Sequence, residues 1–382
     1  MTNNTLIQNG GSILLSDYAV KIADTDILDH TDIKPILLGL YGEVGGIMST
    51  AKKLIRENIA YPRHKKEAEE EFGDTLWYLA ALCRRLDIPL DELFCEATRP
   101  TSDFKMLGVA NDLTRGGFAQ VAVPILTDSP DATLFKLGRS AGALLEDTPK
   151  RTAIACFARD YLHALSAANL KFSDVVHGNL HKTRGAFLDP CQEDLIDFDA
   201  DFGIEEQLPR KFQIRLNQRG SARSYLQWQG VFIGDPLTDN MSDRDGYRFH
   251  DVFHFAYAAI LHWSPVTRAL IKHKRKSIAA YDEEQDSGRA IVVEEGVTAW
   301  IFSRAKELHF FENQKKISLE MLKTIAEFVS GYEVEKCPLK LWEKAILEGY
   351  SVFRQIKDAE GGWIIGDREL RTIRYEAFES QK

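Results

Sequence analysis

Three carboxylates lie in two successive stretches of sequence that have the apolar spacing of amphipathic helices. Glu43 is in the middle of GLYGEVGGIMSTAKKL, and Glu71 and Asp74 lie three residues apart in EEEFGDTLWYLA. Side chains at that spacing project from nearly the same helix face, so antiparallel packing of the two helices would bring the three carboxylates together. Buried like charges repel unless a cation neutralises them, and oxygen ligands of this kind suit Mg²⁺ or Mn²⁺. A solvated acidic helix face is the alternative.

A second group of metal-ligand residue types occurs in the C-terminal half. DGYRFHDVFHFAYAA places His250 and His254 four residues apart, so that both imidazoles share one helix face and could bind one metal ion. Glu294 and Glu295 follow in an otherwise apolar helical stretch, where a carboxylate needs a partner or a cation. His250, His254 and either Glu294 or Glu295 are therefore candidate ligands of a divalent metal. Structural hydrogen bonds inside a core, to Glu295 or to Asp251, are the alternative.

Helical periodicity dominates the rest of the sequence. We expect helices over these ranges: 34–57, 64–86, one beginning near 91, 132–145, 150–168, 172–187, 247–262, 264–276, 288–309, 317–331 and 339–356. A short strand or irregular segment is expected within 213–246, and a short hairpin could close the chain. We therefore predict an all-α fold, with a helical bundle followed by a second, mainly helical C-terminal lobe.

Changes in composition predict the domain boundaries. Residues 1–30 form a polar N-terminal lead-in, 31–190 the first domain, and 213–382 the C-terminal helical domain. The stretch 191–212 is acidic and then basic, which is typical of a linker.

Three segments together resemble the MazG-type, all-α NTP pyrophosphohydrolase family. They are GLYGEVGGIMSTAKKLIRE, EEEFGDTLWYLAALCRRLDIPLDELF and VVHGNLHKTRGAF. The family signature is ExxE on one helix, ExxD on the next and Asn-x-x-Lys on a later helix. This sequence matches it at Glu43, Glu71, Asp74, Asn179 and Lys182.

The resemblance covers about residues 34–98 and 172–187. It implies a MazG-like helical bundle in which 99–171 is an insertion. The C-terminal lobe resembles, more weakly, an extension found on some MazG-like proteins.

A chemistry follows from this resemblance. Such enzymes cut an NTP or dNTP between its α and β phosphates, giving NMP and pyrophosphate. Mg²⁺, or Mn²⁺ in its place, held by the three carboxylates would polarise the phosphates and lower the pKa of the attacking water, and a nearby carboxylate could act as general base. Lys53 and Lys182 are candidate substrate-binding residues that would offset phosphate charge, and Asn179 could hydrogen-bond a base or a sugar.

This sequence departs from the family signature at Gly46, where the second Glu is expected. Glu67 or Glu70 could substitute for it, the site could hold fewer metal ions and act slowly, or the lobe could bind a nucleotide without cutting it. Gly45 and Gly46 would also allow close approach of a backbone or a ligand, and a tight helix–helix contact is the simpler explanation.

Three function hypotheses therefore stay open. The first is a Mg²⁺-dependent nucleotide pyrophosphohydrolase, an enzyme of nucleotide metabolism. The second is a nucleotide-binding sensor or regulatory protein with a degenerate site. The third places catalysis in the C-terminal lobe and leaves the first lobe structural.

Bulk properties narrow the class of protein. The chain has 382 residues and a net charge of −9, which disfavours stable nucleic-acid binding. No apolar run is long enough to span a bilayer, and the N-terminus lacks a signal-peptide layout. The five scattered cysteines fit free thiols in a reducing compartment. We expect a cytoplasmic protein with no membrane contact, and a homodimer, because one short helical pair cannot bury both its faces alone.

Overall fold

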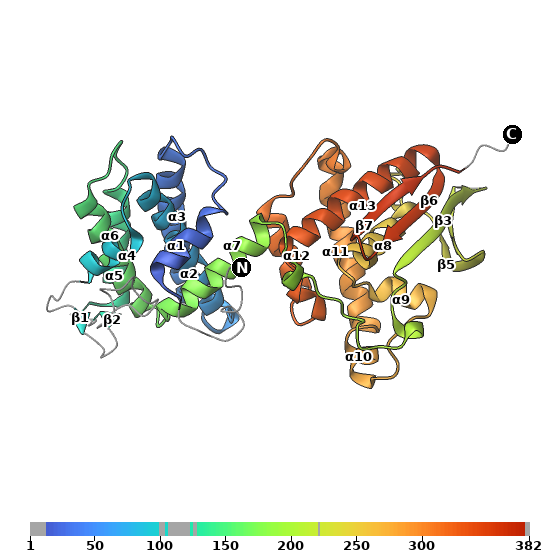
Figure 1. The fold of residues 1–382 in the computed structure, drawn as a ribbon, viewed down its shortest axis with the longest axis horizontal. Coiled ribbons are helices and arrows are strands. Elements are labelled where there is room, and N and C mark those ends of the chain that lie inside the picture. The colour runs from blue at the N-terminus through green and yellow to red at the C-terminus, as the bar shows by residue number, and fades with distance from the viewer. Residues whose placement is uncertain (1–12, 99–103, 106–122, 125–127, 221, 379–382) are drawn as a thin grey trace. The chain divides into compact units, whose positions relative to one another are not determined.

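The structure is a computed structural model, and it describes residues 13–98, 104–105, 123–124, 128–220 and 222–378. The chain forms two compact units, Met1–Leu188 and Asp189–Lys382, which Figure 1 shows in blue to green and in green to red. In the described part of the chain, no helix is both long and apolar enough to cross a membrane.

The N-terminal unit is a helical bundle. Its helices are α1 (Leu15–Ala23), α2 (Lys34–Glu57), α3 (His64–Arg85), α4 (Leu90–Ala97), α5 (Pro130–Gly142), α6 (Arg151–Ala167) and α7 (Phe172–Phe187), with a 3-10 turn η1 (Asn58–Ala60) after α2. A short antiparallel pair is formed by β1 (Phe104–Lys105) and β2 (Val123–Pro124). Helix α3 packs between α2 and α7, and α6 packs against α4 and α5. One continuous apolar core joins all seven of these helices.

Two helices of the predicted insertion belong to that core. Leu137 of α5 and Phe157 of α6 are fully buried in it. Tyr161 of α6 donates a hydrogen bond to the carbonyl oxygen of Phe72 on α3 (3.0 Å), and the two rings make an edge contact. Helices α5 and α6 therefore support the helices that carry the first carboxylates. Residues 99–103, 106–122 and 125–127 of the predicted insertion lie outside the described residues, as do residues 1–12 of the lead-in.

The C-terminal unit combines helices with a sheet. The helices are α8 (Asp251–Ile260), α9 (Pro265–Ile271), α10 (Ala279–Glu284), α11 (Gly288–Glu307), α12 (Leu319–Phe328) and α13 (Leu339–Ala359). The strands are β3 (Lys211–Arg219), β4 (Arg223–Trp228), β5 (Val231–Leu237), β6 (Gly361–Asp367) and β7 (Thr372–Glu376). Short 3-10 turns are η3 (Gln192–Asp194), η4 (Ile204–Glu206), η5 (Tyr247–Phe249), η6 (His309–Phe311) and η7 (Glu333–Lys336).

The predicted all-α fold is wrong because of this sheet. Its five strands are antiparallel in the order β5-β4-β3-β6-β7. Buried and exposed positions alternate along β3, and helices α8 and α13 pack against β6 and β7 (Figure 1). The sheet joins β3–β5 to β6–β7 across the whole helical segment. The three strands β3–β5 and the hairpin β6–β7 are far apart in the sequence, so no local stretch of sequence signals the complete five-stranded sheet.

Helix α8 lies at the centre of the C-terminal core. Every residue of this helix is buried, as expected for a helix that is apolar on all sides. Its two polar side chains, Asp251 and His254, are therefore enclosed in the core and need partners from other elements.

Candidate functional site

Helices α2 and α3 run antiparallel, which places their carboxylates opposite each other. Tyr78 of α3 covers Gly39 near the start of α2, and the carboxylate of Glu71 lies against Gly46 further along. A Cβ atom at either glycine would collide with these side chains. Gly46 therefore gives the Glu71 carboxylate room to lie directly on α2, at the position where the family signature has a second Glu.

Gly45 faces a different neighbour from Gly46. A Cβ at Gly45 would meet no atom within 4 Å. Gly45 lines an open cavity of about 430 Å³ between α2 and α5. The other lining residues are Tyr41, Val44, Met48, Phe135, Gly138 and Arg139. The two adjacent glycines thus differ: Gly46 admits the Glu71 carboxylate, whereas Gly45 borders open space.

Glu43 experiences the charge of both other carboxylates. Burial, then the negative charges of Asp74 and Glu71, and a hydrogen bond with Glu71 raise the pKa of Glu43 to about 8, and Lys182 opposes the rise only in part. The three predicted carboxylates therefore share one environment. A bound proton or cation relieves their repulsion.

Helix α7 brings two further predicted residues to this cluster. Lys182 pairs with Asp74 and lies 2.8 Å from Glu70. Asn179 is buried; its side-chain nitrogen donates to Asp74 (3.2 Å) and its oxygen accepts from Tyr18 (2.8 Å). Asn179 thus orients Asp74. Tyr18 lies on α1 and had no signal in the sequence.

Lys53 lies apart from Lys182. Its ammonium is 3.5 Å from Glu67 and 5.7 Å from the ring centre of Tyr61. Seven residues separate Lys53 from Gly46, which is roughly 10 Å along the helix axis. The structure therefore gathers Glu43, Glu71, Asp74, Asn179 and Lys182, and places Lys53 at the far end of the same helix contact.

The donor chemistry of the N-terminal cluster suits a hard cation. All its acidic ligands are carboxylate oxygens, as Mg²⁺ prefers. Burial and the negative charges of Asp74 and Glu71 raise the pKa of Glu43, so a proton or a cation would stabilise the cluster. Among the described residues, Lys182 brings a positive charge to Asp74 and Glu70. In the part of the chain that the structure describes, one group of three potential metal ligands has ligand atoms that all lie within 4.8 Å of one another. This group belongs to the C-terminal unit.

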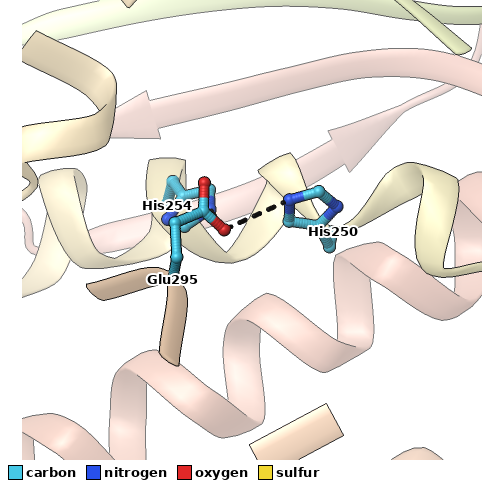
Figure 2. Close-up of side chains that lie close together, drawn as sticks. All are labelled: His250, His254 and Glu295. Carbon is cyan, nitrogen blue, oxygen red and sulfur yellow. Dashed lines mark ion pairs between the residues drawn. The ribbon is translucent and has the colours of Figure 1, made fainter. Parts of the chain in front are cut away.

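That group is His250, His254 and Glu295 (Figure 2). His250 immediately precedes α8, His254 lies one turn into it, and Glu295 comes from α11. The Nε2 atoms of both histidines are 3.5 Å from the same Glu295 oxygen. His254 is fully buried, whereas the Glu295 side chain is 41% exposed.

Second contacts fix both imidazole rings. His250 Nδ1 is 2.9 Å from the carbonyl oxygen of Tyr247, whose ring stacks on it. His254 Nδ1 is 2.8 Å from a carboxylate oxygen of Glu294. Because these acceptors take the Nδ1 protons, the Nε2 atoms are directed to Glu295.

Glu294 and Glu295 have different surroundings. Glu294 is completely buried and also accepts hydrogen bonds from Ser264 (2.6 Å) and the Val266 backbone (2.8 Å) at the start of α9. The sequence left open whether Glu294 or Glu295 is the candidate ligand. In the structure, Glu295 faces the Nε2 atoms of both histidines, whereas Glu294 contacts Nδ1 on the opposite side of the His254 ring.

Charges at this site are strongly coupled. Burial lowers the pKa of His254, but Glu294 and Glu295 outweigh it and raise the pKa to about 10. Burial acts against the ionised form of Glu295, yet His250 and His254 hold its pKa far below the usual range. Burial raises the pKa of the neighbouring Asp251 carboxyl.

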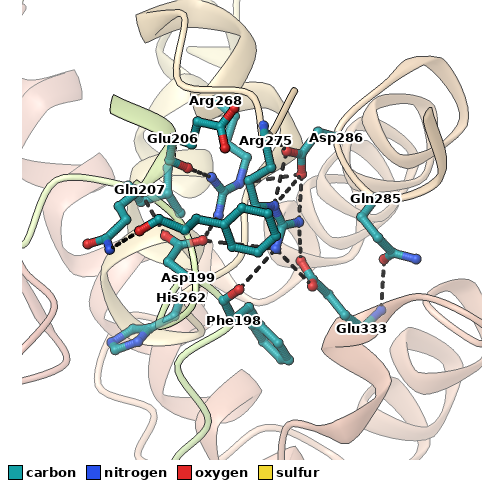
Figure 3. Close-up of polar contacts among 12 residues, drawn as sticks. Phe198, Asp199, Glu206, Gln207, His262, Arg268, Arg275, Gln285, Asp286 and Glu333 are labelled. Carbon is teal, nitrogen blue, oxygen red and sulfur yellow. Dashed lines mark hydrogen bonds and ion pairs between the residues drawn. The ribbon is translucent and has the colours of Figure 1, made fainter. Parts of the chain in front are cut away.

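A network of buried ions holds α9 and α11, the elements that carry these contacts (Figure 3). Arg268 of α9 pairs with Asp199 and lies 3.5 Å from Asp286, just before α11. Arg275 lies 2.7 Å from Asp286 and 2.6 Å from Glu333. Four of the five side chains are at most 1% exposed. The network therefore fixes how α11 begins.

Comparison with known proteins identifies the C-terminal unit. Residues 193–379 match the family described as MazG C-terminal domain. This chain belongs to the MazG-type family. The match covers the C-terminal part of the MazG-type chain, and α2, α3 and α7 lie outside it. Membership indicates a nucleotide pyrophosphohydrolase-type family, and hence a hydrolase with a nucleotide substrate.

A phage protein is also similar to this MazG-type chain. The gene 37 protein of Mycobacterium phage L5 is 30% identical over 78 residues, which is 20% of this chain and 68% of the phage protein. Its name states no activity. No solved structure matches the chain.

Proposed function

We propose that this chain is a Mg²⁺-dependent nucleoside triphosphate pyrophosphohydrolase, which cuts the α–β phosphoanhydride of an NTP or dNTP to NMP and pyrophosphate. The observation that carries the proposal is the environment of Glu43, where burial and then the negative charges of Asp74 and Glu71 raise the pKa to about 8. Carboxylates placed so closely on α2 and α3 fit a site for a cation and its phosphate ligand.

Each residue of the cluster has a role in this proposal. Glu43, Glu71 and Asp74 would hold Mg²⁺, which when bound polarises the phosphates and activates water. Lys182, already at Asp74 and Glu70, would offset phosphate charge on that side. Asn179 keeps Asp74 in position through its own bond to Tyr18.

In the same proposal, a carboxylate near the attacking water acts as general base. Glu43, as a ligand of Mg²⁺, would be ionised, because a bound cation lowers the pKa of the carboxyl that holds it. Gly46 leaves Glu71 in contact with α2, so Glu71 takes the space of the Glu that the family signature places at this position.

A nucleotide-binding sensor or regulatory protein is the second candidate. Two observations favour it: Asp74 is engaged by Lys182 and Asn179, and Gly46 replaces an expected ligand. A regulatory protein would bind nucleotide with metal and release no pyrophosphate.

Product analysis separates the two candidates. The purified chain is incubated with each NTP and dNTP, with Mg²⁺ and then Mn²⁺, and the products are separated by ion-exchange chromatography. We expect NMP and pyrophosphate, and their loss in Glu71→Ala and Asp74→Ala. Nucleotide binding without any turnover, together with activity gained by Gly46→Glu, would instead support the regulatory protein.

We also propose that the chain is a cytoplasmic homodimer, because α2 exposes the apolar side chains of Leu38 and Ile55, which a second copy could cover. Light scattering coupled to size-exclusion chromatography tests the dimer directly. A mass near the 43.2 kDa of one chain would reject it.

A further inference from the structure

We propose that His250, His254 and Glu295 bind one first-row transition-metal ion, with Zn²⁺ as the reference ion, at a site separate from the carboxylates of α2 and α3. The proposal concerns the C-terminal unit alone and does not depend on the pyrophosphohydrolase assignment.

The distance from each imidazole to the carboxylate fits two ligands of a tetrahedral ion, and all three ligand atoms lie within 4.8 Å of one another. Ligand atoms that lie ~2.0–2.2 Å from such an ion are separated from each other by about 3.3–3.5 Å. His250 Nε2 and His254 Nε2 are each 3.5 Å from the same oxygen of Glu295. That separation is long for a hydrogen bond but matches two ligands of one metal.

An unsatisfied nitrogen points into the same space. His254 is 0% exposed, and its Nε2 atom has no hydrogen-bond partner. A buried polar atom left in this way destabilises the fold. A metal ion between the two imidazoles and Glu295 would satisfy it.

The second hydrogen bond of each imidazole is of the kind found around metal-binding histidines in proteins. Ligating histidines usually donate their other N–H to a carboxylate or a carbonyl oxygen, which fixes the ring and its tautomer. His254 does so to Glu294, and His250 to the carbonyl of Tyr247. Glu294 is in turn held by Ser264 and the backbone of Val266.

The donor set also selects the class of metal. Two imidazole nitrogens and one carboxylate favour Zn²⁺ and its first-row neighbours over Mg²⁺, which takes oxygen ligands. Three protein ligands leave a fourth position for water, as in zinc sites that react with substrate. The 41% exposure of Glu295 gives solvent access from that side.

A metal-free alternative uses the same residues. A doubly protonated His254 could lie between Glu294 and Glu295 as a buried ion pair. That arrangement requires no metal, so metal content distinguishes the two directly.

The test measures metal bound to the full chain. The protein is stripped with a chelator, dialysed against ZnCl₂ with excess MgCl₂, and assayed by plasma mass spectrometry. We expect about one Zn²⁺ per chain that Mg²⁺ does not displace. Glu295→Gln and His250→Ala should each lower the affinity at least ~10-fold, since each removes one of the three ligands.

Matched variants control for general effects. Glu307→Gln makes the same change at an exposed position of α11, and His309→Ala removes an exposed histidine of the same unit. Both should keep the bound zinc. Because Glu295 is partly exposed, Glu295→Gln should fold, and its thermal unfolding verifies this.

Two results would overturn the proposal. One is a wild-type chain that retains no Zn²⁺ after dialysis, which would identify His254 as an ion-paired histidine. The other is zinc that binds equally well to wild type and Glu295→Gln, which would place the ion elsewhere, for example on the free cysteines.

Discussion

The two candidate sites differ in how the charge of their carboxylates is balanced. On α2 and α3, three partly exposed carboxylates face each other, and Lys182 with a proton on Glu43 supplies the balancing charge. Between α8 and α11, each imidazole is held by an acceptor on its Nδ1 side, and Glu295 faces both Nε2 atoms. The first arrangement can change its protons and ion pairs easily, whereas the second is fixed in the core.

This difference bears on which ion each site would take. Partly exposed carboxylates that share their charge suit an exchangeable Mg²⁺ that arrives with a phosphate. Preoriented imidazoles suit a resident transition metal. The comparison predicts that substitutions in one unit leave the ion and chemistry of the other unchanged.

The largest expected effect concerns the scaffold of the C-terminal site. Asp199 is fully buried against Arg268 and also accepts from the Leu208 backbone (2.8 Å). Asp199→Ala should lower the stability of the C-terminal unit by about 3–5 kcal/mol, because it takes from the buried Arg268 guanidinium its closest ion partner. Urea unfolding measures the loss. Asp201→Ala, at an exposed position nearby, is the control, and equal stability of the two variants would contradict a structural role for the network.

Asp74→Ala should give the next largest effect. Removing this carboxylate should lower pyrophosphate release about 100-fold or more, equivalent to roughly 2.7 kcal/mol, and leave zinc binding intact. Glu69→Ala is the control on α3, because Glu69 lies five residues from Asp74 and two from Glu71, and so faces a different direction from both. If Asp74→Ala stays active while His250→Ala does not, catalysis belongs to the C-terminal lobe.

Glu294→Gln tests how firmly the imidazole is held. An amide is a poorer acceptor than a carboxylate for the N–H of His254, the Ser264 hydroxyl and the Val266 amide. We expect zinc affinity to fall about 10–100-fold, as for other outer partners of metal ligands. Equilibrium dialysis gives the affinity, and Glu307→Gln is again the control. Unchanged affinity would mean that packing alone orients His254.

Local sequence patterns predicted the helices much better than the sheet. The periodicity over 34–57 and 172–187 gives α2 and α7 with their observed bounds. Strand β3, by contrast, pairs with β6, where Leu216 lies opposite Gly362. A pairing between such distant residues leaves no local periodic signal, and the alternation of buried and exposed residues in β3 is short. Tertiary contacts therefore determine that the fold is mixed α/β and not all-α.

The same limit applies within the sites. The spacing of His250 and His254 predicts that they share a helix face. It does not distinguish Glu294 from Glu295 as the third ligand, because the two adjacent glutamates differ only in the side chains that surround each of them. Gly46 was interpreted as a missing ligand, although its lack of a side chain is what admits Glu71. Such roles depend on the neighbouring helix.

Gly46→Ala and Gly45→Ala form a matched pair on α2. Each should favour the helix by about 1 kcal/mol, but only a Cβ at Gly46 would collide with the carboxylate of Glu71. We expect pyrophosphate release to fall roughly 10-fold in Gly46→Ala, about 1.4 kcal/mol, with little change in Gly45→Ala. Steady-state kinetics of the two variants measure the difference. Equal rates would show that Glu71 can move without cost, and so weaken its assignment as a ligand.

Lys53 should give the smallest effect, because its only described ion pair is a partly exposed one with Glu67. Such pairs contribute about 0.2–1 kcal/mol, so Lys53→Met should raise KM for a nucleotide about threefold and leave kcat almost unchanged. Lys52→Met, at the exposed neighbouring position, should change neither. A fall in kcat would bring Lys53 to the reacting phosphates. The N-terminal site would then extend the roughly 10 Å from Gly46 to Lys53 along α2, and it would be less localised than the site around His254.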